Sequence, residues 1–312
     1  MDDRKKVGLA LSGGGIRGLA HIGVLRALEK YNIPIDFISG TSMGAVVGAL
    51  YSAEPNAKKL EKEILKEDIS DLFDYTLSKA GFVKGDKIER YLKSKLGSVN
   101  FEDLKIKLFV TSYDIKHNRE VIFSKGDIVK ATRASISFPG LFIPVKNKNE
   151  ILVDGGVIDP LPTEILKKAG ADIIIAVNVN FVKENKTKYG ESASSKNSNQ
   201  ELPSIIQVFL KSEEVINARA AESDLEGDKA DMIINIPLGD IGLLDYTKKK
   251  KAIEAGKRYS QRYLKEIKSL HKHSGFIDFI ENIQSKVNIP NIKKEVKKVE
   301  KAVKKTIEGK KN

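Results

Sequence analysis

Cysteine is absent from this chain of 312 residues, histidine occurs four times, and no apolar run is long enough to span a membrane. The absence of cysteine excludes a disulfide framework, a thiolate nucleophile and a cysteine-based metal site. The first residues, Met1–Lys6, lead directly into an apolar segment and lack the hydrophobic core of a secretory signal. We therefore expect a cytoplasmic protein. The contents of 41% hydrophobic and 31% charged residues predict that it is soluble, and its length is sufficient for a full hydrophobic core.

The net charge of +12 is concentrated toward the carboxyl end of the chain. Residues 290–312 contain nine lysines and three glutamates, which account for half of the net charge. Apolar residues recur there and just upstream at helical spacing, at Phe276, Phe279, Ile280, Ile283, Val287, Ile292, Val296, Val299, Val303 and Ile307. We therefore divide the chain into a domain over 1–270 and a basic helical tail over 271–312. Two interpretations of the tail stay open: a helix pair over 276–308 on an anionic membrane surface, or a helical hairpin packed on the domain.

A short pattern between a strand and a helix contains the candidate nucleophile, Ser42. The apolar pair Phe37-Ile38 predicts a strand, Gly40-Thr41-Ser42-Met43-Gly44 follows it, and residues 45–51 predict a helix. In this context a Gly-x-Ser-x-Gly sequence forms a sharp turn that projects the serine oxygen above the edge of the sheet. The flanking glycines lack the Cβ atoms that would collide in such a turn. The pattern also occurs by chance in glycine-rich loops, so its position between a strand and a helix is what favours a functional serine.

A glycine-rich loop follows the first predicted strand, Val7–Leu11, and precedes a predicted helix over 19–30. Its sequence, Ser12-Gly13-Gly14-Gly15-Ile16-Arg17-Gly18, also fits the Gly-x-Gly-x-x-Gly pattern of dinucleotide-binding proteins, but the next strand lacks the acidic residue that such a site needs at its end. Alternatively, the glycines turn backbone N–H groups toward one point beside a helix N-terminus, which suits an oxyanion. Arg17 either supports this loop or is exposed to solvent.

The remaining pattern alternates strands and helices. Strands are predicted over 104–115, 120–123, 151–153, 171–178 and 232–236, and helices over 57–66, 87–96, 204–225 and 247–270. Polar segments between the first two of these helices are expected to be surface loops, and residues 183–201 are expected to form a mobile loop. The alternation predicts an α/β sandwich with a largely parallel sheet.

A serine nucleophile needs a base to accept its proton. The four histidines fall in a predicted helix, a polar turn and a basic stretch rather than at a strand end, at His21, His117, His271 and His273. A carboxylate is better placed, because Asp154 follows the strand over 151–153 and precedes Gly155 and Gly156. Asp-Gly-Gly is also common turn chemistry. Asp154 is therefore either a turn residue or a weak base that requires strong oxyanion stabilisation.

Four sequence blocks together resemble those of bacterial patatin-like phospholipases. Residues 13–18 resemble the oxyanion-hole loop of that family, Gly40–Gly44 its nucleophile elbow, and Asp154–Gly156 its catalytic aspartate motif. Residues 134–139 and 142–144 resemble the block that precedes this aspartate. Four blocks in the same order and at similar spacing are far more specific than any one of them.

The resemblance is closest over residues 7–179 and looser up to residue 270. It implies a three-layer α/β/α sandwich for the domain over 1–270, and hydrolysis of lipid acyl esters by a dyad of Ser42 and Asp154. It also implies an oxyanion-hole loop with Gly13, Gly14, Gly15, Arg17 and Gly18, an elbow shaped by Gly40, Thr41, Met43 and Gly44, and an aspartate motif completed by Gly155 and Gly156. No metal, cofactor or nucleic acid is implied.

We therefore expect a serine lipid acyl hydrolase of phospholipase A or lysophospholipase type that forms an acyl-enzyme. Two alternatives use the same features: a weakly catalytic domain that recruits a membrane or a partner through the basic tail, and an acyltransferase in which another acceptor reaches the acyl-enzyme. A cytoplasmic protein with a lipid-binding tail would sit on the inner face of the membrane. The natural lipid, the acceptor and the oligomeric state do not follow from the sequence.

Overall fold

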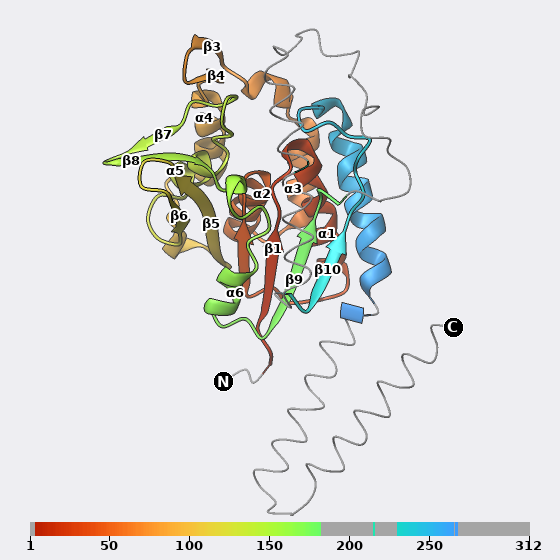
Figure 1. Cartoon of the computed structure of the whole chain (residues 1–312). Helices are drawn as coiled ribbons and strands as arrows, with labels where there is room; N and C mark the ends of the chain where they lie inside the picture. The colour runs from red at the N-terminus through yellow and green to blue at the C-terminus, as the bar shows by residue number, and fades with distance from the viewer. Residues whose placement is uncertain (1–3, 182–214, 216–229, 265, 268–312) are drawn as a thin grey trace, which may run out of the picture. The chain divides into compact units, whose positions relative to one another are not determined.

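An eight-stranded mixed sheet forms the centre of the protein, as the computed structural model in Figure 1 shows. The structure describes residues 4–181, 215, 230–264 and 266–267. The strands follow the order β10-β9-β1-β2-β5-β8-β7, and β6 pairs with β5. Five strands are parallel: β1 (Val7–Leu11), β2 (Phe37–Gly40), β5 (Lys107–Asp114), β9 (Ile173–Asn178) and β10 (Met232–Asn235). Three run antiparallel to their neighbours: β6 (Arg119–Phe123), β7 (Val145–Asn147) and β8 (Glu150–Asp154).

The parallel strands at the centre are apolar because the sheet is covered on both faces. β1 and β9 are buried along their whole length, as expected of parallel strands between two layers. At the end of β1, Leu11 pairs with Gly40 of β2 and with Val177 of β9. The carboxyl ends of these strands therefore meet at one edge of the sheet, and the loops that begin at Ser12 and Thr41 start side by side.

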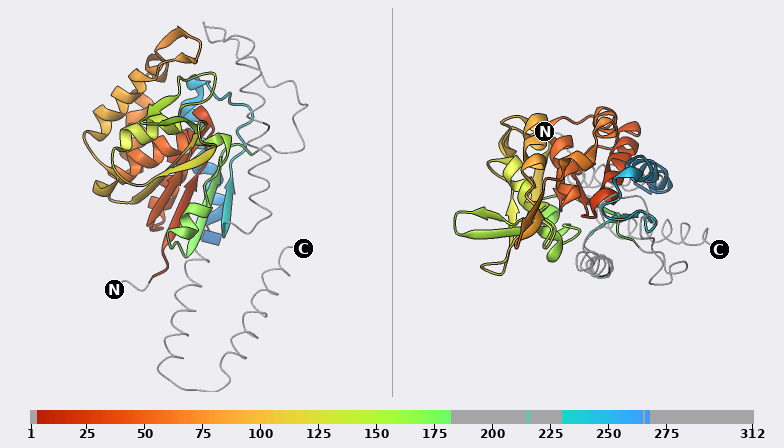
Figure 2. Two further views of the ribbon diagram at one scale, coloured as in Figure 1. Left: turned by 60° about the vertical axis from the view of Figure 1, so that its left-hand side comes forward. Right: turned by 90° about the horizontal axis from the view of Figure 1, so that it is seen from above.

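Helices occupy both faces of this sheet. The α-helices are α1 (Ala20–Lys30), α2 (Met43–Ala53), α3 (Ala57–Lys66), α4 (Asp86–Leu96), α5 (Ile128–Ser135) and α6 (Glu164–Lys168), followed by a helix over residues 249–264. Short 3-10 helices are η1 (Gly15–Leu19), η2 (Ile69–Leu72), η3 (Phe101–Asp103), η4 (Gly155–Val157) and η5 (Tyr246–Lys248). Figure 2 shows the helices around the sheet from two further directions.

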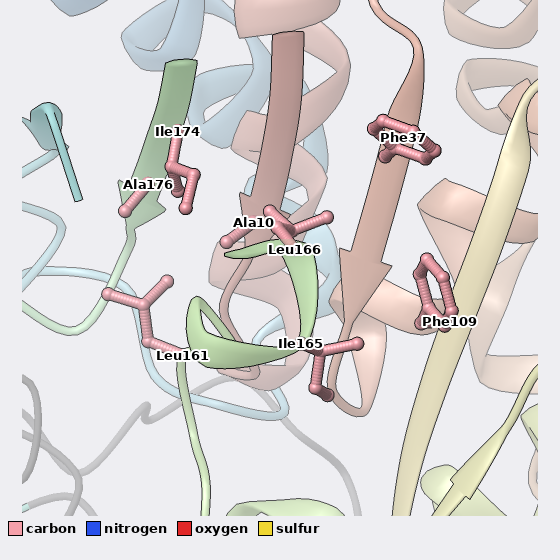
Figure 3. Packing of buried hydrophobic residues seen from close by; sticks show 8 residues of the cluster. All are labelled: Ala10, Phe37, Phe109, Leu161, Ile165, Leu166, Ile174 and Ala176. Atoms are coloured by element: carbon pink, nitrogen blue, oxygen red, sulfur yellow. The ribbon is translucent and has the colours of Figure 1, made fainter. Parts of the chain in front are cut away.

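The two faces are built by alternating side chains of the same strands. Ala10 of β1 and Phe109 of β5 pack in one cluster with residues of α6 (Figure 3). Their neighbours Leu11 and Leu108 point the other way, because they lie within 4 Å of a Cβ atom placed on Gly48 of α2. The predicted α/β/α sandwich is therefore confirmed.

The helix over 249–264 crosses α1 in direct backbone contact. A Cβ atom on Gly256 would lie 2.0 Å from the carbonyl oxygen of Ala20, and one on Gly23 would lie 2.1 Å from that of Ile253. Real Cβ atoms do not come so close to another atom, so only glycine allows this crossing. The long helix that the sequence predicts near the end of the domain is thus packed on the first helix of the chain.

The main departure from the sequence-based expectation is a hairpin between α3 and α4, where we expected surface loops. β3 (Tyr75–Ser78) and β4 (Gly81–Val83) pair antiparallel in a separate two-stranded sheet. β4 also contacts a distant segment, since the N–H groups of Phe82 and Val83 both donate to the carbonyl oxygen of Leu141, at 2.9 and 2.8 Å. A pattern read over a few residues cannot reveal such a long-range partner. The short elements β7 and α6 were not expected either.

Three expectations concern residues that the structure does not describe. They are the mobile loop over 183–201, nearly all of the helix over 204–225, and the tail over 271–312. The compact unit from Lys6 to Ile267 contains all the helices and strands named above. Within the described ranges, no helix is both long and apolar enough to cross a membrane.

Candidate active site

Ser42 lies in a strained turn between β2 and α2. Its backbone angles are φ 54° and ψ −121°, a left-handed conformation that costs a residue with a side chain about 1–3 kcal/mol. The neighbouring glycines make the turn sterically feasible. A Cβ atom on Gly44 would lie 2.2 Å from the carbonyl oxygen of Leu11, and one on Gly40 would lie 2.6 Å from Gly44. The Gly-x-Ser-x-Gly sequence therefore forms the predicted elbow.

Side chains from other elements hold the elbow in place. The N–H of Ser42 donates to Oγ of Ser135, at the end of α5, over 2.9 Å. The preceding residue is fixed as well, because Oγ1 of Thr41 bonds to Oγ1 of Thr111 at 2.7 Å and donates to the carbonyl oxygen of Asp159 at 2.8 Å. These hydrogen bonds stabilise a backbone conformation that Ser42 would not adopt alone.

Asp154 ends β8, where it pairs with Ser112 of β5, and only 3% of its surface is exposed. Its Oδ1 accepts the N–H of Gly156 at 2.8 Å, which is the turn interaction expected of Asp-Gly-Gly. Gly155 is required for a different reason, because a Cβ atom there would lie 2.3 Å from Oγ1 of Thr111. Asp154 thus forms the turn and also lies in the wall of the cavity described below.

The end of α5 connects the serine to the aspartate. Besides the bond from Ser135 to Ser42, the carbonyl oxygen of Ser137 accepts the N–H of Asp154 at 3.0 Å. Arg133 is buried and donates from Nη1 to Oγ of Ser137 at 2.7 Å. The sequence alone indicates no role for the serines of the block over 134–139. The structure shows that they bind the backbone of both candidate catalytic residues.

The glycine loop lies directly against the serine, since a Cβ atom on Gly13 would lie 3.4 Å from Cβ of Ser42. The N–H of Gly13 donates to the carbonyl oxygen of Pro160 at 3.0 Å, so it is already used within the fold. In contrast, no hydrogen bond between described residues uses the N–H of Gly14 or of Gly15. Of the three glycines predicted to hold an oxyanion, these two have donors to offer.

Asn180 orients the peptide group between Gly13 and Gly14. Its side chain is buried, and Nδ2 donates to the carbonyl oxygen of Gly13 at 3.2 Å. The C=O and N–H of a trans peptide point in opposite directions. Because Asn180 binds the carbonyl oxygen, the N–H of Gly14 points away from Asn180. Nothing in the sequence indicates this role, since Asn180 lies beyond the end of a distant strand.

Arg17 and Gly18 connect the glycine loop to neighbouring segments. Arg17 is 2% exposed and donates from Nε to the carbonyl oxygen of Ile241 at 2.6 Å, so the solvent-exposed alternative is wrong. Two residues further along that segment, the carbonyl oxygen of Leu243 accepts the N–H of Ile16 at 2.9 Å. A Cβ atom on Gly18 would lie 2.6 Å from Cβ of Met43. The glycine loop and the elbow are therefore packed against each other.

The serine, the aspartate and the glycine loop all line one cavity of about 140 Å³. Ser42, Asp154 and residues 13–15 contribute to its wall. The rest of the wall is mainly apolar and comes from several elements, with Leu19, Val46, Leu50, Leu92, Phe138 and Phe142 among its residues. An apolar cavity with a few convergent polar groups is typical of a binding site for a largely apolar ligand.

The two described histidines have structural contacts outside this wall. His21 is fully buried, and its Nε2 donates to the carbonyl oxygen of Ser12 at 2.8 Å. Burial lowers the pKa of His21 to about 4, with the hydrogen bond to Ser12 opposing the shift. His117 bonds through Nδ1 to Oδ2 of Asp114 at 2.5 Å. Burial would raise the pKa of Asp114, but the hydrogen bonds from His117, Ile151 and Lys116 outweigh it and lower that pKa to about 2.

His271 and His273 lie outside the described residues. Among the residues that the structure describes, no group of histidine and carboxylate side chains could hold a metal ion. The expectation that the protein uses no metal or cofactor stays a prediction.

Comparison with known proteins assigns this chain to a family. The family model of patatin-like phospholipases matches residues 9–167, which include the glycine loop, the elbow and the Asp-Gly-Gly turn. The chain therefore belongs to the patatin-like phospholipase family, as the four sequence blocks predicted. The crystal structure of VipD from Legionella pneumophila has the same fold, with a TM-score of 0.59 and 14% identity, over 85% of this chain and 67% of that chain.

The curated relatives include the lysophospholipases NTE1 of Yarrowia lipolytica and Candida albicans. The first is 29% identical over 297 residues and the second 31% identical over 293 residues. The matches cover 90% and 88% of this chain, but only 21% of each relative. The chain thus spans about a fifth of the length of the curated relatives it matches.

Proposed function

We propose that this protein is a serine hydrolase of lipid acyl esters, with lysophospholipids and phospholipids as its substrate class. The observation that carries the proposal is that Ser42, Asp154, Gly14 and Gly15 line one largely apolar cavity. The relatives named as lysophospholipases support the same substrate class. An acyl chain would occupy the apolar part of the cavity, with its ester group beside Ser42.

In the proposed reaction, Oγ of Ser42 attacks the ester carbonyl carbon while Asp154 accepts the hydroxyl proton. The carbonyl oxygen becomes an oxyanion, which the N–H groups of Gly14 and Gly15 stabilise. The bond to the alcohol breaks, and the alcohol leaves with the proton from Asp154. Water then gives a proton to Asp154 and attacks the acyl-enzyme. The fatty acid departs as Ser42 regains its proton.

The choice of Asp154 as base follows from the alternatives inside the fold. His21 is buried, has a low pKa and donates its Nε2 proton to Ser12. His117 is bound to Asp114 in the turn between β5 and β6. A carboxylate is a weaker base than a neutral histidine, so the reaction depends strongly on oxyanion stabilisation.

Labelling with a fluorophosphonate, followed by mass mapping of the modified peptide, tests this proposal. We expect the label on Ser42. Ser42→Ala and Asp154→Asn should each lower ester hydrolysis by about a thousandfold or more, and the double variant should lose little more, because the two residues act as one unit. Asp172→Asn is a matched control, since Asp172 binds the N–H of Lys6 near the opposite edge of the sheet.

Two results would contradict the proposal. Labelling of a different serine would rule out Ser42 as the nucleophile. An Asp154→Asn variant that is folded, as judged by circular dichroism, and that keeps its rate would rule out Asp154 as the base.

A further inference from the structure

The β3–β4 hairpin presents an apolar side chain to solvent at its outer end. Leu77 has an exposed fraction of 101%, so no described part of the chain covers it, and Tyr75 is 45% exposed. Among the described strands, β3 and β4 pair only with each other. A single exposed apolar side chain is common on protein surfaces, so what matters is where the hairpin places Leu77.

The base of this hairpin is part of the cavity wall. Phe73 precedes β3 and lines the cavity, and its ring stacks on that of Tyr75 with centroids 6.2 Å apart. On the other strand, Val83 donates to Leu141 at 2.8 Å and accepts the N–H of Ile143 at 2.9 Å. Leu141 lines the cavity as well. A surface that binds the outer end of the hairpin would therefore lie close to the cavity.

The hairpin also lies at the catalytic edge of the sheet. In the side views of Figures 1 and 2 it projects at the end of the molecule toward which β1 and β2 run. The glycine loop and the elbow follow these two strands. A surface that met the outer end of the hairpin would thus face the same end of the molecule as the active site.

The charges on the hairpin suit phosphate groups. Residues 75–84 contain two exposed lysines, Lys79 and Lys84, and no acidic residue. A lysine can keep its ammonium group at the level of lipid headgroups while its methylene chain lies in the more apolar layer below. Lys79 lies two residues after Leu77, and an apolar side chain next to a lysine is the composition of a segment that enters the boundary between headgroups and acyl chains.

We propose that the outer end of the β3–β4 hairpin inserts Leu77 into the surface of a phospholipid bilayer and so places the cavity against the source of its substrate. This inference rests on the proposed function, because it takes a membrane lipid as the substrate. It differs from the expectation for the basic tail, since it assigns membrane contact to the domain itself.

The absence of tryptophan from the chain allows a direct test. Leu77→Trp, made together with Ser42→Ala to prevent hydrolysis, introduces one tryptophan at the outer end of the hairpin. With vesicles of phosphatidylcholine and phosphatidylglycerol, its emission should shift to shorter wavelength and be quenched by lipids brominated on the acyl chain. Ile122→Trp on β6, where Ile122 is 40% exposed, is the matched control and should show neither effect.

Three outcomes would overturn the proposal, and the first is a protein that does not bind the vesicles at all. Binding of the protein to vesicles without a shift at position 77 would overturn the proposal and leave the tail as the site of attachment. A blue shift without lipid that grows with protein concentration would overturn it too, because it would indicate contact with a second copy of the chain.

A second measurement separates the hairpin from the chemistry. Leu77→Ser should lower hydrolysis of vesicle lipids by about tenfold or more, since a buried leucine contributes that much to partition into an apolar phase. Hydrolysis of a soluble short-chain ester should stay unchanged, and Ile122→Ser should change neither rate. Equal vesicle rates for Leu77→Ser and the wild type would refute the hairpin proposal alone. A wild-type protein that cleaves neither substrate would refute the proposed function instead.

Discussion

The glycine loop and the serine elbow follow two adjacent parallel strands, whereas Asp154 ends an antiparallel strand on the other side of β5. On the first side, backbones approach so closely that only glycine fits at Gly15, Gly40 and Gly44. Hydrogen bonds from the end of α5 act on both sides. The hydroxyl of Ser135 accepts the N–H of Ser42, and the carbonyl oxygen of Ser137 accepts the N–H of Asp154.

The candidate active site therefore combines two sources of rigidity, close backbone packing and hydrogen bonds from neighbouring elements. Close backbone packing leaves almost no freedom, and a single added methyl group displaces the loop. A hydrogen bond from a side chain can be removed without a clash, so its loss should reduce the precision of the site without disrupting the fold. Substitution of a closely packed glycine and substitution of a hydrogen-bonding side chain should therefore differ in the size of their effects.

Gly14→Ala tests the close packing of the glycine loop and should have a larger effect than Ser135→Ala or His21→Gln. Gly14 has φ 139°, and a Cβ atom would lie 2.7 Å from Cγ2 of Val179. Its N–H should be displaced from the oxyanion, which should lower kcat by roughly 10- to 1000-fold with a smaller change in KM. Asn180→Ala removes only the bond to the carbonyl of Gly13 and should give a smaller loss of the same kind.

Steady-state kinetics on a short-chain ester would measure both changes. A larger effect on KM than on kcat would contradict the oxyanion role. Saturable NAD or FAD binding by the wild type, together with unchanged hydrolysis in Gly14→Ala, would instead favour the dinucleotide interpretation of the glycine loop.

Ser135→Ala tests the hydrogen bond to the elbow and should lower kcat by about tenfold, because it leaves the partly buried N–H of Ser42 without its acceptor. Labelling of Ser42 by a fluorophosphonate should slow in parallel, and Ser135→Thr, which restores a hydroxyl, should recover part of the rate. Thr132→Val is the matched control. It removes another buried hydroxyl of α5, which bonds to the carbonyl of Ile128 and not to the elbow. A loss of kcat as large in this control would show that Ser135 acts through the stability of α5 alone.

His21→Gln should have the smallest effect on the rate and a distinct effect on stability. The folded protein keeps His21 neutral down to a pH of about 4, whereas in the unfolded chain this histidine takes up a proton near its ordinary pKa of 6.5. The contribution of a neutral His21 is therefore complete above pH 6.5 and is lost as the pH falls toward 4. Between pH 7 and pH 5 the wild type should lose about 2 kcal/mol more stability than His21→Gln.

Urea denaturation at these two pH values would measure this difference, since glutamine keeps a donor for the carbonyl of Ser12 and cannot titrate. Equal losses in both proteins would show that His21 is protonated in the folded state. A large fall in the hydrolysis rate of a folded His21→Gln protein would contradict the assignment of Asp154 as the base.

Much of this arrangement was accessible from local sequence. The apolar run of β1, the strand, elbow and helix around Ser42, and the Asp-Gly-Gly turn at Asp154 each depend on residues close together in the chain. Parallel strands with matched registers then place the glycine loop beside the elbow, so the approach of Gly13 to Ser42 follows from the alternation of strands and helices. Family resemblance added the pairing of Ser42 with Asp154, which local pattern alone left open.

Other features depend on residues that are far apart in the sequence. The glycine loop is contacted by residues much later in the sequence, namely Asn180, Ile241 and Leu243. Similarly, Ser135 at the end of α5 binds the distant Ser42. These residues have ordinary local sequences, so only folding reveals what they bind. The hairpin that carries Leu77 escaped prediction because its polar residues resemble a loop, and its stability comes from Leu141 and Ile143. The sequence by itself determined the turns at the serine and the aspartate, because steric limits act between neighbouring residues. The tertiary structure decided which groups orient these two residues, because hydrogen bonds can form between any residues that the fold brings together.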